Sequence, residues 1–147
     1  MDIERFAWFE PWLARGGQPP KDALRELAAQ GVRIVVNLRE HDETRDVEKV
    51  NMLPVHIPVK NDRAPSDAQV RQWLALCERN GSSERERIFI HCKGGEGRTS
   101  VFCAALRMAQ GVSVEDAIAE QRAYGFEPEG THAEQAQYLR EFAARMS

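Results

Sequence analysis

The chain has 147 residues, of which 42% are hydrophobic and 29% charged; this excludes a disordered or fibrous protein and is typical of one globular domain. A formal net charge of −3 argues against a general nucleic-acid binder, which would carry a basic surplus. No stretch approaches the ~20 apolar residues of a membrane span. The first residues lack the order of a signal peptide, so we expect a cytoplasmic protein with one domain over residues 1–147.

The alternation of helical and strand-like segments can be followed along the chain. The opening segment holds four aromatic residues that we interpret as core or edge packing: Phe6, Trp8, Phe9 and Trp12. After it we predict a helix from Lys21 that stops at Gly31, a buried strand over 33–38, a charged loop from Arg39, and a strand over 53–59. There follow a helix capped by Ser66 and ended by 80–83, a short strand over 87–90, and helices over 99–110, 114–124 and 132–145.

This order predicts an α/β fold, a single domain with a mostly parallel central sheet of about four to five strands flanked by helices. In such sheets, ligands bind beyond the carboxyl ends of the strands. The turn after the strand that ends at Ile90 is therefore the first place to look for a functional site.

That turn runs from His91 to Thr99 and reads HCKGGEGRT. A strand that leads through glycines into a helix N-terminus directs backbone N–H groups at an anion. The same groups and the positive helix end favour the thiolate form of Cys92, which is the nucleophilic form. Arg98 adds a planar fork that matches two phosphate oxygens. The segment thus predicts a nucleophile inside an oxyanion site.

The spacing His91-Cys92-x-x-Gly95-x-x-Arg98-Thr99 resembles the signature of the cysteine-dependent protein tyrosine and dual-specificity phosphatases, and it lies on the strand–turn–helix that this motif requires. Further segments resemble small bacterial and archaeal members of that family: 15–19, 36–39, 56–58, 117–118, 124–126 and 135–139. The resemblance implies the cysteine phosphatase fold and a metal-independent phosphomonoester hydrolase.

The resemblance also implies a role for each residue of the loop. Cys92 would form a phosphocysteine, while Arg98 and the loop residues Lys93, Gly94, Gly95, Glu96 and Gly97 hold the phosphate. Thr99 would donate a hydrogen bond to the sulfur, and His91 would orient the loop. Lys93 favours additional negative charge on the substrate, whereas Glu96 opposes it. The alternative interpretation is that both are solvated residues of the rim.

A general acid must protonate the leaving oxygen. In the family, an aspartate about thirty residues before the cysteine has this role, and Asp62 fits that spacing. Many relatives carry the aspartate one position earlier, where this chain has Asn61. Asp67 is the second candidate, although it is better explained as part of a helix cap.

Three further residues have alternative interpretations. Gln135 stands where relatives often carry a glutamine that positions water, but a helical surface glutamine is equally consistent with the sequence. Cys77 and Cys103 lie at apolar helix positions and are interpreted as core residues, because free cysteine packs as a small hydrophobe. The alternative for Cys103 is a resolving thiol under oxidation. Three cysteines at unrelated spacings predict neither a disulfide framework nor a metal site, and no cofactor is expected.

The expected partner is a phosphorylated protein or a small phosphate ester; the sequence does not indicate an oligomeric state. An inositol polyphosphate or phosphoinositide phosphatase with the same loop chemistry is the alternative enzyme. A non-catalytic phosphate-binding module is the alternative from another functional class.

Overall fold

A computed structural model describes residues 1–80 and 85–146. Its centre is a five-stranded sheet in the order β1-β2-β5-β3-β4. The strands are β1 (Ala7–Glu10), β2 (Leu13–Gly16), β3 (Val32–Asn37), β4 (Leu53–His56) and β5 (Arg87–His91). Strand β1 is antiparallel to β2, whereas the other neighbouring strands are parallel. The carboxyl ends of four strands therefore meet at one edge of the sheet.

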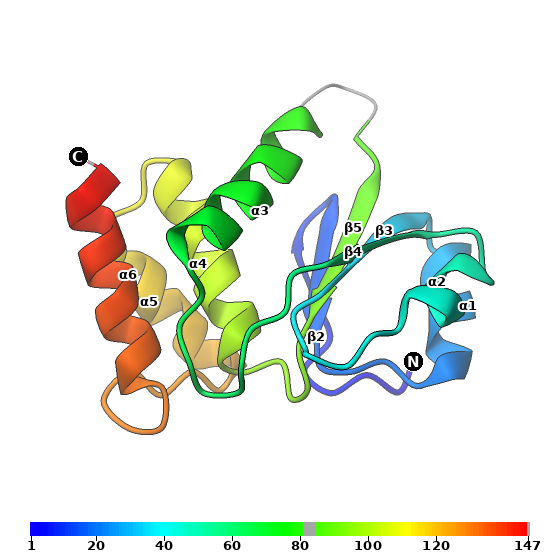
Figure 1. Ribbon diagram of the computed structural model, residues 1–147, viewed down its shortest axis with the longest axis horizontal. Coiled ribbons are helices and arrows are strands. Elements are labelled where there is room, and N and C mark those ends of the chain that lie inside the picture. Colours follow the sequence, from blue (N-terminus) through cyan, green and yellow to red (C-terminus); the bar gives the residue numbers. More distant parts are fainter. Residues whose placement is uncertain (81–84, 147) are drawn as a thin grey trace.

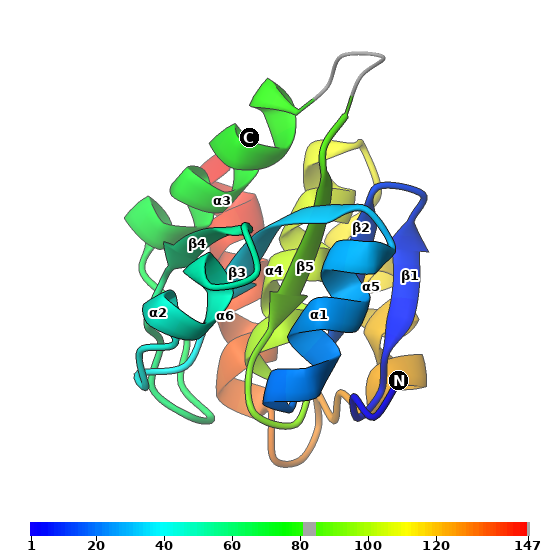
Figure 2. The same cartoon turned by 90° about the vertical axis from the view of Figure 1, so that its right-hand side faces the viewer.

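Helices cover both faces of this sheet (Figures 1 and 2). One face carries α1 (Lys21–Ala29) and α2 (Thr44–Glu48). The other carries α3 (Asp67–Arg79), α4 (Arg98–Ala109), α5 (Val114–Gln121) with the 3₁₀ turn η1 (Arg122–Tyr124), and α6 (Ala133–Met146). The predicted α/β class with a mostly parallel sheet is confirmed.

The central strand β5 shows why the sheet is buried on both faces. Ile88 and Ile90 belong to the larger apolar cluster under α3–α6, while Phe89 belongs to the smaller cluster under α1 and α2. Successive side chains of a strand point to opposite faces, so a continuous apolar run fits a strand with helices on both sides. The cysteine loop leaves this strand at the centre of the sheet.

Most predicted elements lie where the sequence places them, within a few residues at their ends. Ser66 caps α3, accepting from Gln69 N while the Gln69 side chain accepts from Ser66 N. The strand predicted over 53–59 is shorter, because Pro58 has no N–H for a sheet ladder. The sequence predicts that the helix after Ser66 ends over residues 80–83. Residues 81–83 of that segment lie outside the described residues.

Two parts of the sheet layer were not predicted. The aromatic opening segment forms the edge hairpin β1–β2, in which Phe9 is buried and Trp8 is partly exposed. The charged segment after Arg39 contains the short helix α2. Among the described residues, none of the helices combines the length and the apolar character that crossing a bilayer requires.

Candidate active site

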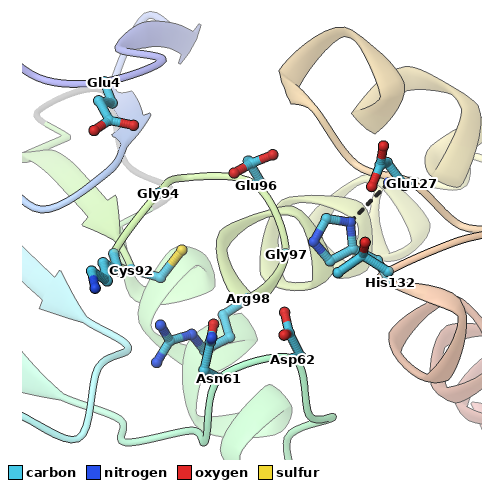
Figure 3. Close-up of a pocket in the computed structure, with 12 residues that line it drawn as sticks. Glu4, Asn61, Asp62, Cys92, Gly94, Glu96, Gly97, Arg98, Glu127 and His132 are labelled. Carbon is cyan, nitrogen blue, oxygen red and sulfur yellow. Dashed lines mark hydrogen bonds between the residues drawn. The ribbon is translucent and has the colours of Figure 1, made fainter.

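The cysteine loop begins where β5 ends and finishes at the first residue of α4. It forms the floor of a pocket of about 420 Å³ (Figure 3). The pocket lining includes Cys92, Arg98 and, from the loop before α3, Asn61 and Asp62. The strand–turn–helix context that the sequence motif requires is therefore present, and a pocket opens above it.

Two hydrogen bonds hold the sulfur of Cys92. The Oγ1 of Thr99 lies 3.1 Å from the sulfur, and the backbone N–H of Gly95 donates to it over 3.3 Å. The side chain is buried, with 3% of the residue exposed. Two donors therefore converge on a sulfur that belongs to the lining of the pocket.

His91 supports the loop from below. Its Nε2 lies 2.7 Å from a carboxylate oxygen of Glu43, and its Nδ1 lies 3.0 Å from the carbonyl oxygen of Cys92. Both ring nitrogens thus lie against oxygen atoms of the surrounding chain, which holds the orientation of the ring. Burial raises the pKa of Glu43, but the hydrogen bonds from His91 and Gln18 and the charges of His91 and Arg39 outweigh it and leave that pKa below its usual value.

Arg98 connects the cysteine loop to the segment that carries Asp62. The Arg98 side chain is buried and donates to the carbonyl oxygen of Val59 over 2.9 Å. Asp62 follows in an exposed turn with a φ of 61°, a left-handed conformation that aspartate tolerates better than most residues. Figure 3 shows the Asp62 carboxylate at the pocket, beside Arg98.

Asp67, the second candidate for the acid, lies elsewhere. It accepts hydrogen bonds from Arg145 and from the hydroxyl of Tyr138, and it is not among the residues that line the pocket. The hydrogen bonds from Arg145 and Tyr138 hold the pKa of Asp67 below its usual value. Asp62, rather than Asp67, thus lines the pocket together with Cys92 and Arg98.

The segment after β1 supports the loop from behind in a way that the sequence did not predict. Arg15 is fully buried and donates to the Gly95 carbonyl over 3.2 Å, to Ser100 Oγ over 3.0 Å and to the side chain of Gln121. Its guanidinium lies 3.8 Å from the centre of the Tyr124 ring. A motif that resembles the family, Arg15 to Pro19, therefore acts as a brace for the loop.

Close backbone packing explains why glycines occur where this segment meets the cysteine loop. A Cβ on Gly95, whose φ is 77°, would lie 2.7 Å from the Gly16 carbonyl carbon, and one on Gly17 would lie 2.6 Å from the Lys93 carbonyl oxygen. Gln18 N also donates to that Lys93 oxygen over 2.8 Å. The two segments pack together at a distance that only residues without Cβ atoms permit.

The rim of the pocket is mostly acidic. Lys93 and Glu96 both line it, as predicted from their place in the loop, and Glu4 and Glu127 add two carboxylates. Glu96 lies 3.7 Å from Arg5, which neutralises part of this charge. Apart from Arg98, Lys93 is the one basic residue in the described lining of this pocket.

Gln135 and His132 both lie beside Gly97, but only His132 reaches the pocket. Gln135 is fully buried, donates to the Arg63 carbonyl over 3.2 Å, and is not among the described residues that line the pocket. His132 does line it. The sequence offered no signal for His132 beyond its place three residues before Gln135, one helical turn away.

The other two cysteines are core residues. Cys77 and Cys103 are free and buried, and burial raises the pKa of both thiols. Within the part of the chain that the structure describes, no group of three His, Cys, Asp or Glu side chains is arranged to hold a metal ion.

Comparison with known proteins gives a family match and related folds. The family described as DSP-PTPase phosphatase fused to NAD+ kinase matches residues 9–141. The dual specificity protein phosphatase TpbA of Pseudomonas aeruginosa is 29% identical over 132 residues, which are 88% of this chain and 59% of TpbA. The chain thus spans about three fifths of the length of this relative.

Two solved structures superimpose on nearly the whole chain. Tk-PTP in its active form is 25% identical, with a TM-score of 0.78 over 96% of this chain and 97% of Tk-PTP. The crystal structure of P. aeruginosa TpbA has a TM-score of 0.76 over 94% of this chain and 84% of TpbA, at 24% identity. Together with the family match, these likenesses show that the chain belongs to the dual-specificity family of cysteine-dependent phosphatases.

Proposed function

We propose that the chain hydrolyses phosphate monoesters through a phosphocysteine on Cys92. The observation that supports this most directly is the pocket in which the hydrogen-bonded sulfur of Cys92, the guanidinium of Arg98 and the carboxyl group of Asp62 meet. A nucleophile, an anion-binding group and an acid in one pocket are the groups that the reaction needs.

In the first step, the Cys92 thiolate attacks phosphorus and the bond to the leaving oxygen breaks. Asp62 gives its proton to that oxygen, while Arg98 and the loop from Lys93 to Gly97 bind the equatorial phosphate oxygens. In the second step, water displaces the sulfur. Thr99 donates a hydrogen bond to the departing thiolate, and His91 keeps the loop in place through the Cys92 carbonyl.

The proposed substrate is a phosphorylated protein or a small phosphate ester. TpbA is named a dual specificity protein phosphatase, which supports phosphorylated side chains as substrates. The rim carboxylates of Glu4, Glu96 and Glu127 disfavour substrates with several phosphates, because like charges repel in a partly desolvated pocket. An inositol polyphosphate is therefore the less suitable substrate. A cytoplasmic location, where thiols stay reduced, belongs to this proposal.

The decisive experiment measures hydrolysis of an aryl phosphate in a chelating buffer. The wild type is expected to turn over, and Cys92→Ser is expected to lose turnover while it still binds a phosphotyrosine peptide. Cys77→Ala is the matched control, since Cys77 is buried in the core away from the pocket. Turnover by Cys92→Ser near the wild-type rate would disprove the nucleophile. Phosphopeptide binding without turnover by the wild type would favour a phosphate-binding module.

A further inference from the structure

His132 forms part of the wall of the candidate active site, although no catalytic motif contains it. It directly precedes α6 and lines the pocket, and 4% of its surface is exposed. Figure 3 shows its imidazole across the pocket from Cys92, on the same side as Asp62. The imidazole therefore lies on the side of the pocket opposite the Cys92 sulfur.

The surroundings of the ring determine which nitrogen carries the hydrogen. The backbone N–H of Glu127 donates to Nδ1 over 2.8 Å (Figure 3). A nitrogen that accepts a hydrogen bond carries no hydrogen, so a neutral His132 is protonated on Nε2. The ring also stacks on Phe126, with centroids 5.2 Å apart and planes 6° apart, which holds its orientation.

The Nε2 edge is turned toward the phosphate loop. Cδ2, the ring atom bonded to Nε2, would lie 2.8 Å from a Cβ on Gly97. Nothing in residues 1–80 or 85–146 forms a hydrogen bond with Nε2, so this donor is available to a molecule in the pocket. Gln135, in contrast, is fully buried behind Gly97 and directs its amide nitrogen to the Arg63 carbonyl.

We propose that His132 binds the water that attacks the phosphocysteine; this rests on the function proposed above. The water oxygen accepts a hydrogen bond from Nε2–H and attacks phosphorus with its other lone pair. The phosphorus–sulfur bond breaks, and its electron pair returns to Cys92 as thiolate. One water proton passes to the Asp62 carboxylate, and the other leaves on the phosphate product, so atoms and charge balance.

Two variants separate this chemistry from a structural role. His132→Asn places a side-chain oxygen near the position of Nδ1, where it can still accept from Glu127 N, but it has no donor at the position of Nε2. His132→Gln places an amide N–H near that position. His132→Asn removes one neutral hydrogen bond to the water and should slow hydrolysis of the phosphoenzyme roughly tenfold. His132→Gln should recover much of the rate.

The readout is burst kinetics with an aryl phosphate. For His132→Asn we expect a rapid burst that releases one equivalent of the phenol product per enzyme molecule. A slow steady-state rate should follow. Because only the second step is slowed, kcat and KM should both fall about tenfold while kcat/KM stays within about twofold of the wild type. His41→Asn, at an exposed histidine outside the pocket lining, is the control and should give no new burst.

Several outcomes would overturn the role of His132. A fall in kcat/KM as large as that in kcat would place its effect in the first step or in folding. Equal rates for the Asn and Gln variants at position 132, or the same burst with the control His41→Asn, would also contradict it. Failure of the proposed function looks different, since no covalent phosphate would then be trapped on Cys92 in any variant or in the wild type.

Discussion

Glu43 accepts a hydrogen bond of 2.7 Å from His91, and this contact ties the loop before α2 to the residue beside the candidate nucleophile. The two residues are 48 positions apart in the sequence. Both are buried, and Gln18 donates a second hydrogen bond of 2.9 Å to the same carboxylate. The cysteine loop is thus supported by a buried, hydrogen-bonded pair inside the fold.

Glu43→Gln tests this pair through its dependence on pH. The pKa of Glu43 in the folded protein lies below its usual value near 4.5, so the carboxylate stabilises the fold above that value and loses this effect as the pH falls through the folded-state pKa. We expect Glu43→Gln to lower the free energy of unfolding by about 1–3 kcal/mol near neutral pH. Below about pH 4.5, the difference from the wild type should shrink. Urea denaturation at both pH values measures it, with the exposed Glu40→Gln as control.

Asp62→Asn is expected to lower kcat by about 10²–10⁴ for an alkyl phosphate, since general acid catalysis contributes that much when the leaving oxygen needs a proton. The loss should be smaller for an aryl phosphate with an acidic leaving group. The pH profile should also lose the limb that reports the acid. Asp67→Asn should keep kcat but lower the melting temperature, because it weakens the contacts with Arg145 and Tyr138. The opposite pattern would assign the acid to Asp67.

Arg15→Met is expected to destabilise the fold by about 2–4 kcal/mol, because it leaves buried acceptors at Gly95, Ser100 and Gln121 without their donor. The loosened loop should also bind tungstate, a phosphate analogue, more weakly. Arg5→Met is the matched control. Arg5 also donates to the loop, at the Gly94 carbonyl over 3.1 Å, but it is solvent-exposed, and such contacts contribute about 1 kcal/mol or less. Equal effects of the two variants would contradict a bracing role for Arg15.

Gly95→Ala and Gly111→Ala separate backbone strain from crowding. Both glycines have a positive φ, 77° and 96°, which costs an alanine roughly 1–2 kcal/mol. A Cβ on Gly111 meets nothing within 4 Å, whereas one on Gly95 would lie 2.8 Å from Gly17 N. We therefore expect Gly111→Ala to be mildly destabilised with its phosphatase activity intact. Gly95→Ala should lose both more stability and most of its activity, as measured by thermal melting and kcat. Full activity in Gly95→Ala would show that the loop tolerates the displacement.

The candidate site at the cysteine loop could be predicted from the sequence because its parts are contiguous. A β-branched and aromatic strand, a glycine-rich turn and a helix start follow one another from Arg87 to Thr99, and local backbone geometry brings Cys92 and Arg98 to one pocket. The α/β class follows equally from local patterns, as the apolar runs at 33–38 and 87–90 show.

The hairpin β1–β2 could not be predicted in the same way. Its strands have four residues each, and the aromatic side chains of the first do not alternate regularly between apolar and polar. Strand pairing depends on partners distant in the sequence, here β5 for β2. A short edge segment carries too little periodic signal to reveal them.

The sequence by itself determined the fold class and the candidate site of a cysteine, an arginine and a glycine loop, since each of these depends on neighbouring residues. Only the tertiary structure decided which distant side chains complete the site: Asp62 rather than Asp67 at the pocket, Glu43 under His91, Arg15 behind Gly95, and His132 at the wall. These residues lie 30 to 80 positions away in the sequence from the loop residues that they approach. They come together only when the sheet and α6 have packed. Which of the candidate side chains reach the site depends on burial and on distances in the folded chain. Neither quantity is set by a local stretch of sequence.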